Sequence, residues 1–174
     1  MGNSTNNENK KVGLLSEWLA IICGYNKKEA QTIGLAGVLH DIGKLYTPHH
    51  ILDKPGKLTN DEFNTIKLHT LYGYNLLSNM LDGDYKEVVK TVALYHHEHY
   101  DGNNGYWGIA AKHLPLYVNI VSICDVFCAL LEKRCYKNQW PPEEVMAYIC
   151  SKSGTQFDPF LVRQFIQMMH NDTN

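Results

Sequence analysis

Apolar residues recur at helical spacing along most of the chain. The apolar positions Leu15, Trp18, Leu19 and Ile22 lie three or four residues apart, which is typical of one face of an α-helix. Gly24 suits the left-handed conformation that often ends such a helix. The same periodicity predicts further helices at about residues 27–41, 60–77, 84–97, 115–133, 142–153 and 159–170. No segment shows the sustained period-two alternation of a strand, so we predict an all-α fold of about six to seven helices.

Polar residues mark where several of these helices begin. Asn26 and Thr59 are each followed three residues later by glutamate, so both are predicted to form capping boxes. Asp84 has the same spacing to a glutamate and is predicted to start the next helix. Residues 47–63, which are rich in proline, glycine and aspartate, are predicted to form a loop.

The composition is that of an ordinary globular domain. Of the 174 residues, 44% are hydrophobic and 20% are charged, so the chain can bury one substantial core. We expect residues 1–10 to form a polar N-terminal tail and residues 11–174 to form a single domain. The sequence does not indicate an oligomeric state.

The charge balance and the apolar runs argue against several kinds of partner. A formal net charge of −2 gives no reason to expect DNA or a membrane surface. No apolar run approaches the roughly 20 residues of a membrane span, and the polar start has no signal-peptide core. Five cysteines without C-x-x-C spacing favour reduced thiols, so we expect a cytoplasmic protein.

Four histidines interrupt helices that are otherwise apolar. His40, His69, His96 and His97 would each be costly to bury without a hydrogen-bond partner or an ion. Any one of them alone is best interpreted as a core histidine bonded to a backbone carbonyl. Asp125, which is flanked by isoleucine, cysteine, valine and phenylalanine, has the same need for a partner. Taken together, the set favours a metal site.

The donor atoms of this set suit a transition-metal centre. Imidazole nitrogens and carboxylate oxygens favour iron or manganese, with nickel or zinc as alternatives, over a structural thiolate site. Neighbours on a helix diverge by about 100°, so two adjacent pairs can each serve two nearby ions. We therefore expect two divalent ions. The predicted ligands are His40, Asp41, His69, His96, His97 and Asp125.

A series of short motifs resembles the HD-GYP domains, a subset of the HD phosphohydrolase superfamily. In chain order these are HDIGK, ILDKPGKLT, HHEH followed by DG, GYW in place of GYP, LPL, DVF, RCYK and SGTQFDP followed by LV. The resemblance spans roughly residues 8–166. It implies an all-helical HD-type domain that hydrolyses the bacterial second messenger cyclic di-GMP to linear pGpG, with GMP as the product of further cleavage.

The resemblance also implies roles for individual residues. It assigns the six residues named above to the metals, and it assigns catalytic roles to Asp41 and Lys44, the latter by stabilising charge on the scissile phosphate. Arg134 and Lys137 fall where family members hold the second phosphate, and Tyr106 is placed to stack on a guanine or to bond a phosphate. Such domains are usually fused to sensor or GGDEF-type domains, so the chain is compatible with a fragment of a longer protein.

The chain departs from the family pattern at several positions. Glu8 stands where the family has an upstream histidine ligand, so it is a seventh candidate ligand, although it falls in the polar tail. Ser4 replaces an acidic residue that some members use for a third metal, which favours two ions. Trp107 replaces the proline of the GYP motif and removes a fixed φ from the loop. His99 and Cys128 replace an arginine and an aspartate near the ligands.

These departures leave rival interpretations open. A degenerate module that binds a cyclic dinucleotide or a partner protein with little turnover is one alternative. Another is an enzyme that acts on a different cyclic dinucleotide, such as cyclic GMP-AMP. A mononuclear HD phosphohydrolase acting on nucleotides is disfavoured, because the histidines supply more ligands than such a site needs.

Overall fold

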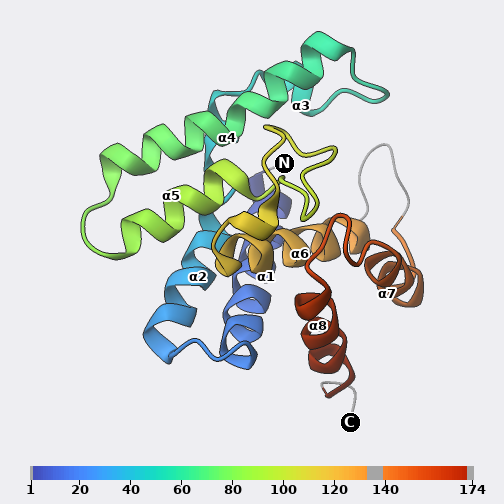
Figure 1. The fold of residues 1–174 in the computed structure, drawn as a ribbon. Coiled ribbons are helices and arrows are strands. Elements are labelled where there is room, and N and C mark those ends of the chain that lie inside the picture. Colours follow the sequence, from blue (N-terminus) through green and yellow to red (C-terminus); the bar gives the residue numbers. More distant parts are fainter. Residues whose placement is uncertain (1, 133–138, 172–174) are drawn as a thin grey trace.

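The computed structural model describes residues 2–132 and 139–171, which form eight α-helices and two short 3₁₀ helices (Figure 1). The described residues contain no named β-strand, so the predicted all-α class is confirmed. The α-helices are α1 (Gly2–Ile22), α2 (Lys27–Leu39), α3 (His49–Leu52), α4 (Asn60–Met80), α5 (Tyr85–Tyr95), α6 (Leu116–Leu131), α7 (Pro142–Ser151) and α8 (Pro159–Asn171). The 3₁₀ helices are η1 (Ile42–Tyr46) and η2 (Ala111–His113).

Helix α6 lies at the centre of the fold. It carries the most apolar sequence of the helices, and its side chains from Val118 to Cys124 are all buried. Helices α1, α2, α5, α7 and α8 all contact it. Helices α4 and α5 run side by side at the top of the view in Figure 1, and the loop that follows α5 crosses the front of the molecule. The core therefore forms around α6, and the ends of α2 and α5 meet near it.

Local sequence signals account for most helix starts. Asn26 and Thr59 both form the predicted capping boxes, in which each side chain and that of the glutamate three residues later bond the opposite backbone N–H. Helix α5 begins directly after Asp84, as predicted, although the Asp84 side chain makes no capping hydrogen bond. Gly24 has a φ of 92°, as expected for the residue that ends α1.

Two segments differ from the helices predicted by the apolar pattern. Helix α1 begins at Gly2, so residues 2–10, which were expected to form a polar tail, are helical. Once a packed helix is nucleated, each added residue gains a backbone bond, and a polar segment can extend it without an apolar face. Helix α3 is a single turn inside the predicted loop at residues 47–63, and it brings the total to eight.

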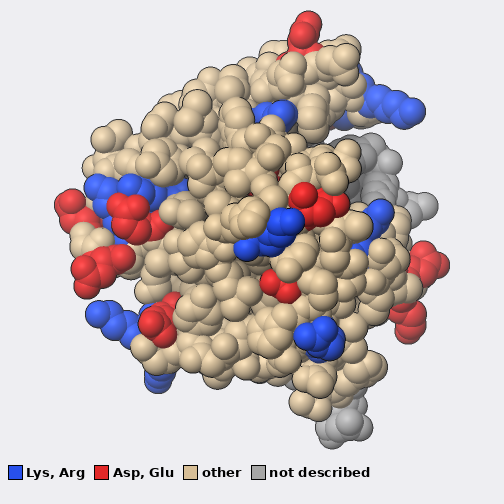
Figure 2. Space-filling model, viewed as in Figure 1, with Lys and Arg blue, Asp and Glu red and all other residues tan. Residues whose placement is uncertain are grey.

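The described helices and the charged side chains on one face bear on the kinds of partner that the surface could bind. None of the described helices is both long and apolar enough to cross a membrane. On the face shown in Figure 2, Lys and Arg side chains are scattered among Asp and Glu side chains, without a continuous basic patch among the described residues. This distribution agrees with the small net charge of −2.

Candidate metal centre

The six predicted ligands converge from five parts of the fold. His40 is the C-cap of α2, Asp41 precedes η1, His69 lies in α4, the pair at 96–97 follows α5, and Asp125 lies in α6. Their donor atoms form two groups, in each of which all atoms lie within 4.8 Å of one another. The first group is Asp41, His69, His96 and His97, and the second is His40, His96 and Asp125.

The two carboxylate oxygens of Asp41 are turned toward different groups. Its Oδ1 lies 3.1 Å from Nε2 of His69 and 3.8 Å from Nε2 of His96. Its Oδ2 lies 3.3 Å from Nε2 of His40, which belongs to the other group. The adjacent pair at 40–41 therefore divides between two sets of donors, as the helical divergence of neighbouring residues predicts.

Asp125, in α6, contributes the carboxylate of the second donor group. Its Oδ1 lies 3.4 Å from Nε2 of His40. The ring of His40 also meets the ring of His96 at 4.9 Å between centroids, in an edge-to-face arrangement. This single nitrogen of His40 thus lies between the carboxylates of Asp41 and Asp125.

Backbone carbonyls fix the orientation of three imidazoles. Nδ1 of His40 lies 2.6 Å from the carbonyl oxygen of Gly37, and Nδ1 of His69 lies 2.6 Å from that of Ile66. Nδ1 of His96 lies 3.1 Å from the carbonyl oxygen of Val92. A carbonyl can only accept, so each Nδ1 carries a proton, and each Nε2 points into the site, where the neutral ring can offer its lone pair to an ion. This is the arrangement that metal-binding histidines adopt.

Several buried polar atoms at this place lack a hydrogen-bond partner. They are Nε2 of His40, His69 and His96, together with Oδ1 of Asp41, and none of them has such a partner among the described residues. Leaving polar atoms buried in this way costs about 1–3 kcal/mol each, and more for charged groups. Four such atoms that face one another fit divalent ions well, because one cation satisfies several lone pairs at once.

The electrostatics of the site favour bound cations. Burial, with the neighbouring imidazoles, holds the pKa of both His96 and His97 well below the usual value, so both rings are neutral donors. Burial opposes the charge on His40, but Asp41 and Asp125 outweigh it and raise its pKa to about 10. Burial likewise opposes the charge on Asp41, but Lys44 and His40 hold its pKa well below its usual value. The carboxylates that attract a proton to His40 attract a metal cation for the same reason.

Gly43 sets the distance between η1 and α4. A Cβ added at Gly43 would lie 1.9 Å from the carbonyl oxygen of His69 and 2.5 Å from the backbone nitrogen of Gly73. No side chain fits there, so the backbone of η1 rests directly on α4 and carries Asp41 to His69. The sequence analysis did not single out Gly43, and its only signal was a glycine inside the HDIGK motif.

Lys44 lies at the edge of the donor groups. Its ammonium donates to Oδ2 of Asp41, the oxygen that faces His40, and its side chain is about one third exposed. A cation in this place is accessible from solvent and close to both donor groups. The predicted placement of Lys44 beside the reacting centre remains compatible with this geometry.

Tyr106 covers the side of the first group. Its ring stacks on that of His97 with centroids 4.3 Å apart and lies 6.1 Å from the ring of His69. Burial raises the pKa of its phenol, so the hydroxyl stays protonated and can donate a hydrogen bond. The predicted substrate residue therefore lies next to the predicted metal ligands.

Glu98 anchors the loop that carries Tyr106, and the sequence analysis missed it. Its carboxylate is buried and accepts bonds of 2.7 Å from the backbone nitrogens of both Trp107 and Ile109. A Cβ at Gly105 would lie 2.6 Å from Oε2 of Glu98, so a side chain there would displace this carboxylate. An acidic residue directly after a histidine pair was the only available signal.

The remaining predicted site residues are less closely tied to the centre. Glu8 lies in α1, outside both donor groups, but its charge, after burial and that of Asp125, helps to raise the pKa of the Cys128 thiol to about 12. Cys128 is buried in α6, one helical turn after Asp125. Arg134 and Lys137 lie outside the described residues.

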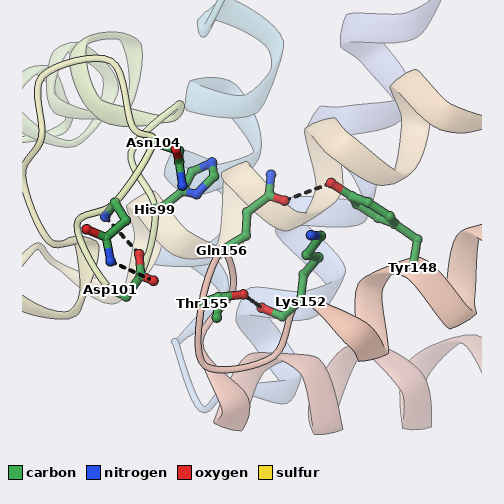
Figure 3. A pocket seen from close by; sticks show the side chains of 8 residues that line it. His99, Asp101, Asn104, Tyr148, Lys152, Thr155 and Gln156 are labelled. Atoms are coloured by element: carbon green, nitrogen blue, oxygen red, sulfur yellow. Dashed lines mark hydrogen bonds between the residues drawn. The ribbon is translucent and has the colours of Figure 1, made fainter.

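His99 lines a polar cleft of about 720 Å³ that is separate from the donor groups (Figure 3). One wall of this cleft is formed by residues that follow α5. Lys152 and Gln156 face the cleft from the turn between α7 and α8. The hydroxyl of Tyr148, in α7, donates a 3.0 Å hydrogen bond to Oε1 of Gln156. The backbone nitrogens of residues 100 and 101 donate hydrogen bonds to carbonyl oxygens of this turn, which joins the two segments that line the cleft. None of the six predicted ligands lines this cleft. His99 therefore contributes to a neighbouring surface rather than to the donor groups.

Known proteins resemble most of this chain in sequence. The HD domain family matches residues 3–161. The chain is 42% identical over 147 residues to the cyclic di-GMP phosphodiesterase response regulator RpfG of Xanthomonas campestris pv. campestris, covering 84% of this chain and 38% of RpfG. It is 35% identical over 158 residues to 3'3'-cGAMP-specific phosphodiesterase 2 of Vibrio cholerae, covering 91% of this chain and 30% of that protein. The chain thus spans less than half the length of these relatives.

The fold is also shared with a solved structure. Bd1817, an HDG"Y"P protein from Bdellovibrio bacteriovorus, matches with a TM-score of 0.73 and 17% identity, over 96% of this chain and 53% of that one. At this identity the likeness concerns the fold alone. The family match, the sequence relatives and the converging histidines and aspartates agree with one another. The chain therefore belongs to the HD-domain family, as its HD-GYP-like motifs predict.

Proposed function

We propose that this chain is a metal-dependent phosphodiesterase domain that hydrolyses cyclic di-GMP to linear pGpG. The observation that carries the proposal is the set of buried donor atoms without hydrogen-bond partners, which come from His40, Asp41, His69 and His96. The relatives named as phosphodiesterases of cyclic di-GMP and of 3'3'-cGAMP support the substrate class.

Asp41, His69 and His97 would hold one divalent ion and His40 and Asp125 the other, and His96 would bind one of the two through its single free nitrogen. Such ions supply a nucleophilic water with a lowered pKa and neutralise charge on the phosphate. Iron or manganese fits the nitrogen and oxygen donors best. We include Glu8 as a further ligand on the side of Asp125, because its charge helps to raise the pKa of the Cys128 thiol, one helical turn after Asp125.

The chain's own residues would position the substrate. Lys44, which is partly exposed beside Asp41, would donate to a phosphoryl oxygen as charge develops there. Asp41 would hold this ammonium in place through their hydrogen bond. Tyr106 would bound the site on the side of His97. Arg134 and Lys137 would hold the second phosphate, as paired cations suit this task.

A cytoplasmic location is part of the proposal. Cys23, Cys124, Cys128 and Cys150 are all free in the structure, which agrees with reduced thiols. Sensor or GGDEF-type domains as partners are also part of the proposal, since the chain spans less than half the length of RpfG and of the Vibrio cholerae relative.

The test combines a metal count with product analysis. The protein is loaded with manganese or, without oxygen, with ferrous iron, and bound metal is counted by mass spectrometry after gel filtration. Cyclic di-GMP is then added and the products are separated by chromatography. We expect two ions per chain and the appearance of pGpG. A metal-loaded protein that forms no linear product would contradict the proposal and favour a module that only binds.

A further inference from the structure

A lysine lies between two aromatic rings at the edge of the candidate metal centre. The ammonium of Lys67 lies 5.6 Å from the ring centroid of Tyr106 and 5.6 Å from that of Trp107. Both distances are within the range of a cation–π contact. Lys67 belongs to α4 and precedes the candidate ligand His69 by two residues. The cation is therefore held near the reacting centre without being one of its ligands.

Exposed aromatic rings surround this lysine. Phe63 packs edge-on against Tyr106 at 5.7 Å between centroids. Phe63 is 44% exposed and Trp107 is 41% exposed, so both rings present surface to solvent. We call Phe63, Lys67, Tyr106 and Trp107 the aromatic rim. Its inner member, Tyr106, stacks on His97, so the rim begins at the candidate ligands and extends outward to solvent.

The rim is fixed in place by hydrogen bonds. The backbone N–H of Trp107 donates to Glu98, and its indole Nε1–H donates to Oγ1 of Thr70 at 3.2 Å. Thr70 is buried in α4, one turn after Lys67, and its hydroxyl donates in turn to the carbonyl of Lys67. Rings that are held before a ligand arrives lose little freedom when it binds.

This combination of groups suits a purine that carries acceptors. Exposed aromatic rings stack on bases of any kind, so stacking alone does not select one. An ammonium donates only, and it matches guanine, whose O6 and N7 are both acceptors. Adenine presents an amino donor in place of O6 and would leave the ammonium of Lys67 facing a donor. The lysine can therefore discriminate where the rings cannot.

We propose that the aromatic rim is a guanine subsite, in which Lys67 donates to O6 and N7 of a base that the rim's rings receive. This inference rests on the proposed function and deepens it, since it selects substrates that contain guanine. Both cyclic di-GMP and cyclic GMP-AMP contain a guanine, whereas cyclic di-AMP does not. Tyr106 contacts both His97 and Lys67, so the rim adjoins the donor groups at which a phosphate would bind.

The test compares guanine with adenine substrates in matched variants. The ratio of kcat/KM for cyclic di-GMP to that for cyclic di-AMP is measured for the wild type, for Lys67→Met and for Lys67→Arg. We expect Lys67→Met to lower this ratio roughly 10-fold, mainly through KM, within the range known for base contacts. Lys67→Arg should retain the ratio, because arginine also donates to O6 and N7. Lys27→Met, an exposed site at the far end of α2 from His40, is the control.

The aromatic part of the subsite has its own variants. Trp107→Phe keeps a ring but removes the indole N–H, and Trp107→Ala removes both. We expect the alanine variant to raise KM for every cyclic dinucleotide without changing the guanine-to-adenine ratio. A bound-metal count and a thermal unfolding curve for each variant exclude loss of the ions or of the fold as the cause.

The possible failures are distinguishable. Turnover by the wild type with an unchanged ratio in Lys67→Met would overturn the guanine subsite and leave the proposed function intact. If the metal-loaded wild type hydrolyses no cyclic dinucleotide, the proposed function fails, and dissociation constants for cyclic di-GMP and cyclic di-AMP then provide the same comparison. Equal loss of affinity for both ligands in Lys67→Met, or no loss for either, would contradict the inference.

Discussion

The substitution Gly43→Ala should disable the site without touching any candidate ligand. Gly43 lies where η1 rests on α4, between Asp41 and the backbone of His69. Adding one methyl group there forces apart two segments that each carry a donor of the first group. The chemistry of all donors is unchanged, so the variant tests their placement alone.

The magnitude follows from the available space. The new Cβ would lie 1.9 Å from the carbonyl oxygen of His69, whereas real Cβ atoms essentially never come closer than 3.0 Å to another heavy atom. The neighbouring atoms are backbone on both sides, so η1 and α4 have to separate by about 1 Å rather than let a side chain rotate. A misplacement of about 1 Å can cost roughly 100-fold in rate. Overpacking of this kind also costs typically about 1–3 kcal/mol of stability.

The assay has three readouts and one matched control. For Gly43→Ala we expect Tm to fall by about 2–12 °C, since each kcal/mol is worth about 2–4 °C at this chain length. Bound metal should also fall, and kcat/KM for cyclic di-GMP should fall about 100-fold. The control is Gly73→Ala on the facing helix, where the nearest atoms to an added Cβ, on Ala93 and Gly43, lie at 3.4 Å. Alanine favours a helix interior over glycine by about 1 kcal/mol, so this control should be as stable as the wild type or more so.

Two results would refute this reasoning. Wild-type values of Tm, metal content and rate in Gly43→Ala would show that the close contact is not required. An equal loss in Gly73→Ala would show that the contact between η1 and α4 is sensitive to any added bulk, and that Gly43 has no special place in it.

Three further predictions concern charged and ligating groups. His69→Ala should lower the metal count and abolish hydrolysis while the circular dichroism spectrum stays helical; full metal content would argue against a ligand role. Lys44→Met should keep the metal and slow turnover about 100-fold, the loss typical of one donor to a developing charge, and an unaltered rate would remove Lys44 from the mechanism. Glu8→Gln should weaken the binding of one ion selectively in a metal titration, because a carboxylate ligand becomes an amide. An unchanged titration curve would show that Glu8 is not a ligand.

Much of the helical framework is legible in the sequence, because its signals are local. The capping boxes at Asn26 and Thr59 form as predicted, since they depend only on residues three positions apart. The early start of α1 at Gly2 was not predictable in this way, because residues 2–10 show no apolar periodicity. The missing capping bond at Asp84 shows the same limit, since a suitable spacing does not guarantee the backbone geometry.

In the candidate site, too, only the residues with a local sequence signal could be predicted. The donors could be predicted by type, because an imidazole or a carboxylate inside an apolar helix needs a partner wherever that helix packs. The contributions of Gly43 and Glu98 could not, because both arise from contacts between segments that are distant in the chain. Gly43 allows η1 to pack directly against the backbone of α4. Glu98 accepts hydrogen bonds from the backbone nitrogens of Trp107 and Ile109.

The changed GYP motif illustrates how such contacts alter the interpretation of a sequence. The family's proline would fix one φ of the loop, but it has no N–H and could not make the 2.7 Å bond from residue 107 to Glu98. Trp107 makes that bond and adds a second one from its indole to Thr70. The loop is therefore held by hydrogen bonds in place of a restricted dihedral. Because Tyr106 precedes Trp107 and stacks on His97, this anchoring keeps the ring beside a candidate ligand. The departure from the GYP motif is thus compatible with an ordered site, because hydrogen bonds replace the restriction that proline would impose on the loop.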